Sequence, residues 1–261
     1  MIEKLKEIVA EAGDQLLDLR RSKGFAGEWK GSQFKAKADL ILHHFLVDNL
    51  GAIAPDIPVI SEEDPESWKY FGSGNYFIID PIDGTASFIQ EYEGFVTQVA
   101  HVKNGNVVCS AICVPVTGDI YWAVHNKGAF LNTKQLNISD PFRWMTLIDN
   151  YPEPRGITGL AFKELGFNRY IESGSISLKI CKIADNTADI FFKNVSVQQW
   201  DVAAPYLILK ECGGTLLEIH GKEITHSSHQ VYPGIVAANS ERNAKCLITW
   251  YSNHNNGEVL S

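Results

Sequence analysis

The first residues of the chain alternate between apolar and charged positions with a helical period. Apolar residues recur every three to four positions between Met1 and Lys23, with acidic and basic residues between them. This pattern is typical of an amphipathic helix that buries one face. We expect two N-terminal helices, over residues 2–22 and 36–50. The apolar positions of the first are Ile2, Leu5, Ile8, Val9, Ala12, Leu16 and Leu19.

Further along, the period shortens to that of β-strands. Short apolar runs predict strands near residues 57–61 and 76–80. Alternating apolar runs continue from Phe95 to Asn132, with turns at Asn104-Gly105 and Thr117-Gly118-Asp119. Because alternation broken by glycine-containing turns is typical of antiparallel hairpins, this region is predicted to be a meander.

The second half of the chain has a different organisation. The loops near Asp140-Pro141 and the proline-rich stretch Tyr151-Pro152-Glu153-Pro154 mark the change. Strands are expected at 144–149, 188–193, 215–219 and 234–238, and helices at 176–185, 201–212 and 240–250. Such alternation indicates an α/β layer. We therefore expect an N-terminal α+β subdomain over residues 1–140 and a C-terminal α/β subdomain over residues 141–261.

Composition and charge narrow the class of protein. A chain of 261 residues that is 45% hydrophobic and 21% charged can bury a large core, as one large or two coupled domains. Its net charge of −8 argues against nucleic-acid polymers and anionic membranes as partners. No apolar run reaches the length of a membrane span, and the N-terminal pattern lacks the apolar core of a signal peptide. Because the five cysteines also form no Cys-x-x-Cys pair, a cytoplasmic location is expected.

The stretch Asp80-Pro81-Ile82-Asp83-Gly84-Thr85 carries the strongest chemical signal in the chain. Two carboxylates three residues apart can face one small volume, and their oxygens suit Mg²⁺, which can take up phosphate and water. Gly84 lets the backbone come close to a ligand, so the amides that follow can point at an anion. The alternative is a plain turn, because Asp-Pro and Asp-Gly pairs favour turns by their backbone preferences alone.

Two further acidic segments lie at predicted element edges. Ser61-Glu62-Glu63-Asp64 follows a short β-branched run, and Trp200-Asp201 starts a helical pattern that ends at Gly213-Gly214. The alternatives are a solvated loop or a helix cap at Ser61, and an N-cap role for Asp201. Taken together, the three segments predict a metal-assisted phosphate site.

Other chemistries lack their motifs in this sequence. There is no P-loop, no dinucleotide-binding glycine loop and no nucleophile elbow. His226 and His229 are separated by Ser227-Ser228, which predicts a loop and not a zinc site.

The order and spacing of the acidic motifs resemble the inositol monophosphatase superfamily of Mg²⁺-dependent, lithium-sensitive phosphatases. The family pattern of Glu-Glu, Asp-Pro-Ile/Leu-Asp-Gly/Ser-Thr, and Trp-Asp followed eleven residues later by Gly-Gly is present here as Glu62-Glu63, Asp80 to Thr85, Trp200-Asp201 and Gly213-Gly214. The resemblance runs from about residue 36 to residue 240. It implies a layered αβαβα sandwich of the inositol monophosphatase and fructose-1,6-bisphosphatase type, with the metal site between its two halves.

Within the superfamily, the chain is most similar to bacterial 3′(2′),5′-bisphosphate nucleotidases. Their Ser-Glu-Glu-Asp segment resembles residues 61–64, and their Gly-Ser-Ser-Leu-Lys segment resembles residues 174–179 with one extra residue. Lys193 stands where many of them carry an arginine. By this resemblance Lys179 and Lys193 would meet a second phosphate, the base or the ribose. The alternative for both is a solvated lysine, which is the commoner fate of this residue type.

The resemblance also implies a set of site residues. Glu62, Asp80 and the backbone carbonyl of Ile82 would hold one Mg²⁺, and Asp80, Asp83 and Asp201 a second. The resemblance also allows a third, more weakly bound ion that Glu62 would hold through water. Two ions about 3.5–4 Å apart can polarise the phosphoryl group and generate the attacking hydroxide. The implied catalytic residues are Thr85, Glu62 and Asp83, and the implied substrate-binding residues are Ile82, Asp83, Gly84, Thr85, Ser175, Lys179, Lys193 and Asp201.

The chain departs from the family pattern near its N-terminus. Family members carry a Lys-x-Asp-x-Ser-Pro-Val-Thr-x-Ala-Asp stretch whose first Asp orients the threonine. Here Ala38-Asp39 matches, but the first Asp and the Val-Thr are absent, and Gln33, Lys35 or Lys37 occupies the neighbourhood. Three explanations stay open: Glu62 and Glu63 orient the water, the third metal site is altered, or a lysine replaces a cation.

The sequence therefore predicts a Mg²⁺-dependent phosphomonoesterase acting on a small phosphorylated substrate. The resemblance favours the 3′-phosphate of 3′-phosphoadenosine 5′-phosphate, which would leave AMP and phosphate. One alternative is the same chemistry on inositol monophosphate or a sugar phosphate. An alternative of another class is a non-catalytic relative that binds a phosphorylated metabolite. The resemblance also implies inhibition by lithium and admits a homodimer, which is common in the family.

Overall fold

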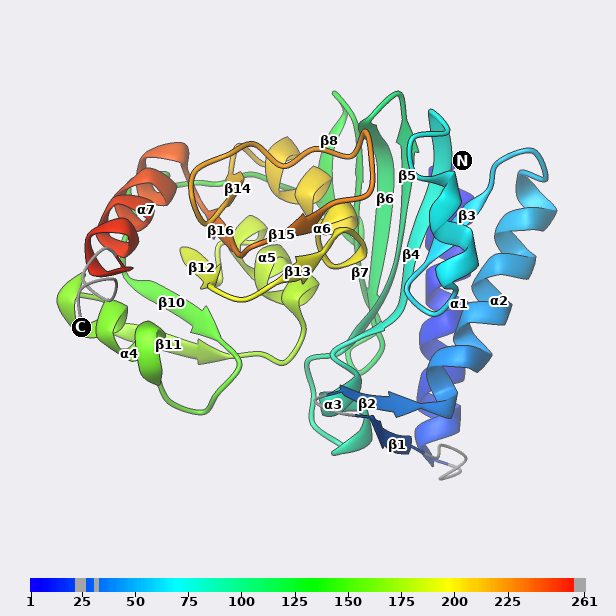
Figure 1. The fold of residues 1–261 in the computed structure, drawn as a ribbon, viewed down its shortest axis with the longest axis horizontal. Helices are drawn as coiled ribbons and strands as arrows, with labels where there is room; N and C mark the ends of the chain where they lie inside the picture. Colours follow the sequence, from blue (N-terminus) through cyan, green and yellow to red (C-terminus); the bar gives the residue numbers. More distant parts are fainter. Residues whose placement is uncertain (22–26, 31–32, 256–261) are drawn as a thin grey trace.

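The chain folds into stacked layers that alternate between helices and sheets (Figure 1). The structure is a computed structural model that describes residues 1–21, 27–30 and 33–255. Among these residues, the two large sheets have seven and five strands. Helices α1 (Ile2–Arg21) and α2 (Lys37–Ile53) cover the outer face of the seven-stranded sheet, α5 (Ile176–Ala184) and α6 (Gln199–Glu211) lie between the sheets, and α4 (Gly156–Glu164) and α7 (Glu241–Asn255) cover the far face of the five-stranded sheet. The predicted layered αβαβα sandwich is confirmed.

Strands of the seven-stranded sheet follow one another in chain order. They are β3 (Val59–Ser61), β4 (Asn75–Asp83), β5 (Val96–Lys103), β6 (Asn106–Val114), β7 (Asp119–Val124), β8 (Gly128–Leu131) and β9 (Lys134–Leu136). β3 and β4 are parallel, and each later pair is antiparallel, which confirms the predicted meander. Asn104 and Gly105 have φ values of 51° and 74°, as a tight two-residue hairpin turn requires.

The apolar side of the amphipathic N-terminal helix packs on the outer face of this sheet. Leu5, Val9 and Leu16 of α1 are fully buried in one apolar cluster with Leu46 of α2 and Phe77 of β4. Both predicted N-terminal helices are therefore confirmed, with ends that differ from the prediction by at most three residues.

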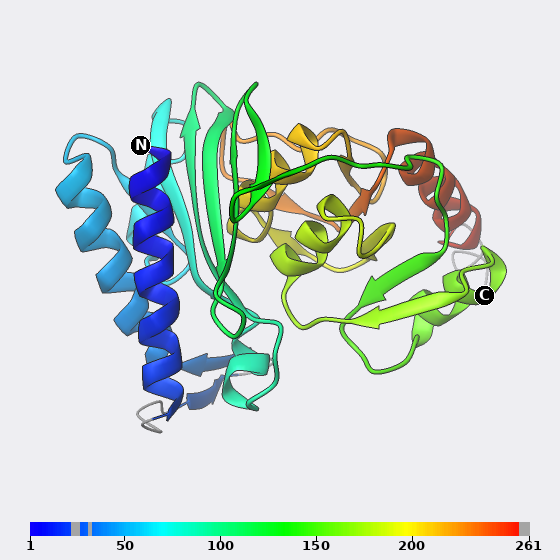
Figure 2. The same ribbon diagram turned by 180° about the vertical axis from the view of Figure 1, so that it is seen from behind.

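A short hairpin between these two helices was not predicted. Strands β1 (Gly27–Lys30) and β2 (Gln33–Ala36) pair antiparallel, so that α2 begins only at Lys37. The hairpin lies beside the short helix α3 (Thr85–Ile89), which follows the Asp80–Thr85 segment (Figure 2). Gln33 and Lys35 belong to the stretch that departs from the family pattern, and their side chains lie outside the part of the chain that is described.

The five-stranded sheet has the order β11-β10-β12-β16-β14. Its strands are β10 (Thr146–Asp149), β11 (Arg169–Glu172), β12 (Ile190–Lys193), β14 (Thr215–Glu218) and β16 (Ile235–Ala238). β10 is parallel to β11 and β12, whereas β16 is antiparallel to β12 and β14. The four predicted strands are confirmed to within two residues. Helix α4 and strand β11 were not predicted, since α4 contains two glycines and β11 is short and half polar.

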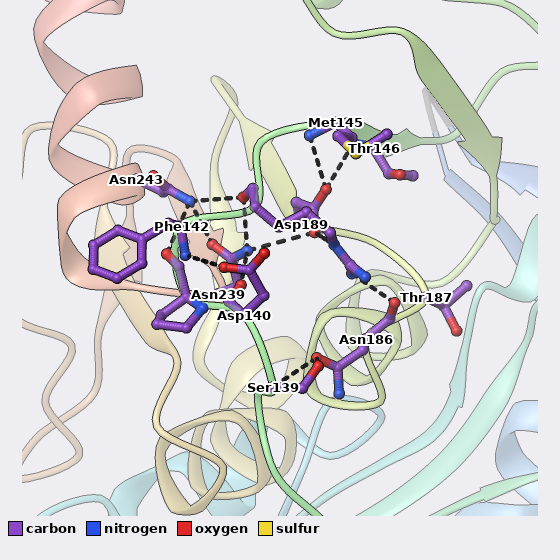
Figure 3. Close-up of polar contacts among 12 residues, drawn as sticks. Ser139, Asp140, Phe142, Met145, Thr146, Asn186, Thr187, Asp189, Asn239 and Asn243 are labelled. Atoms are coloured by element: carbon purple, nitrogen blue, oxygen red, sulfur yellow. Dashed lines mark hydrogen bonds and ion pairs between the residues drawn. The ribbon is translucent and has the colours of Figure 1, made fainter.

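A buried polar network ties the segment before β10 to the five-stranded sheet and to α7 (Figure 3). At its centre, the carboxylate of Asp189 is fully buried. It accepts hydrogen bonds from the guanidinium of Arg143 and from the backbone N–H groups of Met145 and Thr146, the latter two at 2.9 and 2.8 Å. Asn239 extends the network, because its side-chain amide donates to the carbonyl of Arg143 at 2.9 Å. Both carboxylate oxygens of Asp189 thus have partners.

The cysteines of the chain are unpaired. Cys109, Cys113, Cys181 and Cys212 are buried, whereas Cys246 on α7 is exposed. Burial raises the pKa of the Cys109 thiol to about 11 and that of the Cys113 thiol to about 12. In the described part of the chain, no helix has the length and apolar character needed to cross a membrane.

Candidate metal centre

Strand β4 brings Asp80 and Asp83 to the same side of the sheet by means of a bulge. In a regular strand, residues three apart point to opposite faces. Here Asp80 pairs with Gln98 and Asp83 pairs with Val96, so β4 spans three steps while β5 spans two. The extra residue falls at Pro81-Ile82, where the proline has no N–H to give to the ladder. The sequence Asp-Pro-Ile-Asp thus turns both carboxylates toward one point.

Asp201 joins these two carboxylates from the first turn of α6. Single carboxylate oxygens of Asp80, Asp83 and Asp201 lie within 4.8 Å of one another. Asp201 is not the N-cap of the helix, which was the alternative role expected for it. The N-cap is Gln198, and Asp201 closes a capping box by accepting a hydrogen bond from the Gln198 N–H at 2.8 Å. This hydrogen bond uses the Oδ2 atom of Asp201.

Asp83 is held by the N-terminus of α5. Its carboxylate accepts hydrogen bonds from the Ser175 hydroxyl at 2.6 Å, the Ser177 N–H at 2.7 Å and the Ile176 N–H at 3.2 Å. Ser175 is also the N-cap of α5, because its hydroxyl oxygen accepts from the Leu178 N–H. Ser175, predicted to bind substrate, is therefore fully buried and bonded to Asp83.

Two further carboxylates act on the centre from nearby. Glu62 follows β3 and is not among the three acids whose oxygens meet within 4.8 Å. It is nevertheless the charge that raises the pKa of Asp80 most, ahead of Asp83 and Asp201. Asp39 on α2 is buried and raises the pKa of Asp80 as well. No role was predicted for Asp39, although its position in the Ala38-Asp39 pair was a usable signal.

Asp80 and Asp201 hold their protons more tightly than isolated carboxylates. Burial, followed by the charges of Glu62 and Asp83, raises the pKa of Asp80 well above its ordinary value. Burial and then the charge of Asp83 raise the pKa of Asp201 to about 7. Crowded carboxylates of this kind are stabilised as anions when a divalent cation is bound among them. The hard oxygen donors therefore fit Mg²⁺.

The segment after Asp83 is shaped to approach a ligand closely. Gly84 has a φ of 93°, and a Cβ atom at this position would lie 3.0 Å from the carbonyl oxygen of Gly94. Any other residue would therefore be strained there. Thr85 begins α3, and its hydroxyl donates to the Ile82 carbonyl at 2.9 Å. The Ile82 N–H in turn donates to Asp80 at 3.0 Å, so this turn is braced against the acids.

The two predicted substrate lysines differ in their surroundings. Lys179 on α5 is fully buried, donates to the side-chain oxygen of Asn150 and lies 4.9 Å from the centre of the Phe191 ring. Burial lowers its pKa to about 8. Lys193 is half-buried at the end of β12, and its charge acts on Asp201. The alternative of a solvated lysine is therefore wrong for Lys179, whereas Lys193 keeps part of its surface exposed.

A cavity of about 800 Å³ lies between the α3 segment and the segment that leads into α5, and none of Asp80, Asp83, Asp201 and Glu62 lines it. Ala86 and Ser87, which follow Thr85, form one wall, and Ser173 and Gly174, which precede Ser175, form another. Tyr92 and Tyr151 also line it, together with three carboxylates and one lysine, which are Glu93, Asp119, Glu172 and Lys182. The cavity thus has room for a group larger than phosphate, and it reaches the site only through residues that neighbour Thr85 and Ser175 in the chain.

Comparison with known proteins finds relatives that match most of the chain. The family model described as "Inositol monophosphatase family" matches residues 1–255. The 3′(2′),5′-bisphosphate nucleotidase CysQ of Salmonella typhimurium is 27% identical over 239 residues, covering 89% of this chain and 96% of the relative. An inositol monophosphatase of Dictyostelium discoideum is 24% identical and covers 87% and 88%, respectively. The crystal structure of the extragenic suppressor protein suhB from Bartonella henselae has a TM-score of 0.80 at 23% identity and covers 95% and 96%.

The fold and the acidic centre define a metal-dependent phosphatase. The chain belongs to the inositol monophosphatase family.

The raised pKa of Asp201 leads us to predict how the stability of the metal-free protein depends on pH. Because the carboxyl titrates near 7 in the folded chain and at its ordinary value of 3.8 when unfolded, the folded state binds the proton more tightly. The stabilisation that this proton gives is complete below pH 3.8 and is lost as the pH rises through 7. In EDTA at pH 8, Asp201→Asn should therefore be more stable than the wild type, by on the order of 2 kcal/mol. Adding Mg²⁺ should reverse the order, since only the wild type gains a full set of anionic ligands.

Chemical unfolding at pH 5 and pH 8, with EDTA and with Mg²⁺, measures this reversal. Asp56→Asn, at an exposed aspartate, is the matched control and should show no reversal. If Asp201→Asn were less stable than the wild type in EDTA at pH 8, the carboxylates would not repel one another in the folded chain.

Proposed function

We propose that this phosphatase is Mg²⁺-dependent and removes the 3′-phosphate of 3′-phosphoadenosine 5′-phosphate, leaving AMP. The convergence of Asp80, Asp83 and Asp201 is the observation that carries the chemistry. The likeness to the nucleotidase CysQ, at 27% identity over most of both chains, supports the choice of substrate.

The cation would be held by the acids that already meet in the fold. Asp80, Asp83 and Asp201 are its proposed ligands, with Glu62 and the Ile82 carbonyl completing the set. A bound Mg²⁺ supplies polarisation of the phosphoryl oxygens and lowers the pKa of the attacking water. A pair of ions, and a third held more weakly by Glu62, belong to the same proposal.

The remaining groups of the site position the phosphate and the water. The N–H groups of Gly84 and Thr85 are proposed to contact the phosphate, because Gly84 allows the backbone to come close. The Thr85 hydroxyl is a poor base alone, so it needs a carboxylate that can accept a proton. Asp39, buried and close enough to act on Asp80, is the carboxylate we propose for this role in place of the absent N-terminal aspartate.

The rest of the substrate is proposed to occupy the cavity of about 800 Å³. This volume lies in the range of small-molecule sites and admits a nucleoside, and Tyr92 and Tyr151 offer rings on which a base can stack. Lys193 is the cation we propose for the 5′-phosphate, since its charge reaches Asp201. Lys179 and Ser175 would act indirectly, through Asn150 and Asp83.

A second candidate is the same chemistry on inositol monophosphate or a sugar phosphate. The charge of the cavity favours it, because Glu93, Asp119 and Glu172 outnumber the single Lys182. A neutral polyhydroxylated leaving group would not be repelled by these carboxylates, whereas a second phosphate would be.

A comparison of substrates separates these two candidates. We expect kcat/KM for 3′-phosphoadenosine 5′-phosphate to exceed that for inositol 1-phosphate by at least about tenfold, one charge-assisted contact being worth that much. Lys193→Gln should then lower the value for the bisphosphate by roughly tenfold and leave that for inositol 1-phosphate unchanged.

Steady-state phosphate release at saturating Mg²⁺ gives both values. Lys69→Gln, at an exposed lysine, is the control and should match the wild type on both substrates. Equal kcat/KM values for the two substrates, or a higher value for inositol 1-phosphate, would contradict the nucleotidase proposal and favour the second candidate.

Three further properties belong to the proposal. We propose inhibition by lithium and a homodimer, both from the family resemblance. We also propose a cytoplasmic location, because the unpaired cysteines suit a reducing compartment.

A further inference from the structure

We infer that the loop of residues 225–232 positions the metal centre from outside, by locking the Glu62 segment against the Asp201 segment. This inference rests on the proposed Mg²⁺ site and adds residues that have no ligand role in it. The loop precedes and includes the short strand β15 (Val231–Tyr232), and we call it the strap.

Four aromatic rings connect the strap to both segments. His229 of the strap is stacked on Phe71, with ring centres 4.7 Å apart and planes at 10°. Its ring also lies 5.3 Å from that of Trp68 and 6.3 Å from that of Trp200. Trp68 and Trp200 contact each other at 5.2 Å. We call these four residues the aromatic stack.

Each tryptophan of the stack is connected to a proposed ligand through the backbone. Trp68 is hydrogen-bonded to the residue before Glu62, and Trp200 is the residue before Asp201. Trp68 lies in the short helix η1 (Pro65–Tyr70), and its indole N–H donates to the Ser61 carbonyl at 2.9 Å. Ser61 immediately precedes Glu62. Trp200 immediately precedes Asp201, and its carbonyl accepts from the Gln98 side chain at 3.0 Å. A displacement of either ring therefore moves one proposed ligand relative to the other.

The strap is closed by a hydrogen bond between its two ends and is anchored to neighbouring elements. The Tyr76 hydroxyl of β4 donates to the His226 carbonyl at 2.6 Å, and the Tyr232 hydroxyl donates to the Thr225 carbonyl at 2.7 Å. The Gln230 N–H donates to the Gln199 side chain of α6 at 3.1 Å. In addition, β15 pairs with β13 (Val197–Gln198), the strand that leads into α6. The strap thus contacts the seven-stranded sheet and the start of α6 at once.

The chemistry of the site explains why such a lock matters. Ligands to an octahedral Mg²⁺ must lie near 2.0–2.1 Å from the ion, and a shift of about half an ångström is enough to weaken a site. Glu62 and Asp201 come from segments far apart in the chain, and no covalent link fixes their separation. The aromatic stack supplies that constraint by packing. His229 is a positioning residue, because it acts through Trp68 and Trp200 and not on the ion.

His229→Ala tests the inference, because His229 is exposed and its removal leaves the anchors of the strap in place. We expect Mg²⁺ binding without substrate to weaken roughly tenfold, as for other residues that orient metal ligands. The Mg²⁺ concentration for half-maximal turnover should rise by the same factor, while kcat at saturating Mg²⁺ stays within about twofold. His229→Phe keeps a ring in the stack and should restore both values to within about twofold.

Trp68→Phe provides a second, independent variant. It retains a ring but loses the hydrogen bond to Ser61, so Mg²⁺ affinity should fall even though the stack persists. His220→Ala, at an exposed histidine in the turn directly after β14 and outside the strap, is the matched control and should bind Mg²⁺ like the wild type.

Titration calorimetry with Mg²⁺ alone separates the outcomes. Unchanged affinity in His229→Ala, or a lower melting temperature in EDTA with unchanged affinity, overturns the inference and leaves the proposed function intact. A wild type that binds Mg²⁺ but hydrolyses none of the substrates overturns the proposed function, while the affinities still decide the inference. A wild type that binds no Mg²⁺ overturns both.

Discussion

Asp80→Asn is expected to lower Mg²⁺-dependent phosphate release by about a thousandfold. The side chain of Asp80 is almost fully buried and feels the charges of Glu62, Asp83 and Asp201 together. Asparagine keeps the acceptor for the Ile82 N–H but removes the negative charge at the middle of the centre. Stabilisation of the transition-state charge by a metal amounts to several kcal/mol, and each 1.36 kcal/mol is a factor of about ten. Steady-state release of phosphate across a range of Mg²⁺ concentrations measures the loss.

The matched control for this prediction is again Asp56→Asn, which should keep wild-type activity. A variant at position 80 that retains more than a tenth of the wild-type rate would show that the acids are not the metal ligands. Loss of all Mg²⁺-dependent turnover also argues against a non-catalytic, metabolite-binding relative, because such a protein has no turnover to lose.

The second large effect concerns stability at the other sheet. Asp189→Ala is expected to lower the free energy of unfolding by about 3–5 kcal/mol, the range for removing one partner of a buried charged pair. The substitution leaves the Nε–H of Arg143 and the N–H groups of Met145 and Thr146 without their acceptor, while the Arg143 guanidinium keeps its hydrogen bond to the Asn186 carbonyl. Because the segment before β10 would come loose from β12, cooperativity of unfolding should also fall. Equilibrium urea unfolding measures both quantities.

Asp140→Ala is a fitting comparison for Asp189→Ala. Asp140 is an aspartate of the same segment, but it is exposed, and within the described part of the chain its carboxylate accepts only from the Phe142 N–H. Its loss should cost less than about 1 kcal/mol. If the two variants were equally stable, the buried network in Figure 3 would contribute little to the fold.

Much of the fold could be predicted because local pattern and tertiary structure agree. The meander follows from alternation and from Asn104-Gly105, where the left-handed φ values need just such residues. Helix α1 follows from its apolar period. Where the local signal was weak, prediction failed: α4 carries two glycines, β11 is a short edge strand, and β1 and β2 are short strands with few apolar residues.

The candidate site divides in the same way. Asp80, Asp83 and Asp201 could be predicted because each lies where an apolar element ends or begins, and the structure brings their oxygens together. The bulge at Pro81-Ile82, which makes that convergence possible, depends on pairing with β5 and is invisible in local sequence. The same is true of the aromatic stack, in which Trp68 and Phe71 lie more than a hundred residues before Trp200 and His229. It is also true of Lys179, whose burial depends on packing against Phe191.

The distribution of thiols has a practical consequence. Four cysteines lie in the interior, where burial holds them in the protonated, unreactive form, and Cys246 alone among the five lies at the surface. The native chain therefore offers a maleimide dye or spin label a single attachment point on α7, without any engineering. Modification of the four buried cysteines would then measure the fraction of molecules that have unfolded locally or globally.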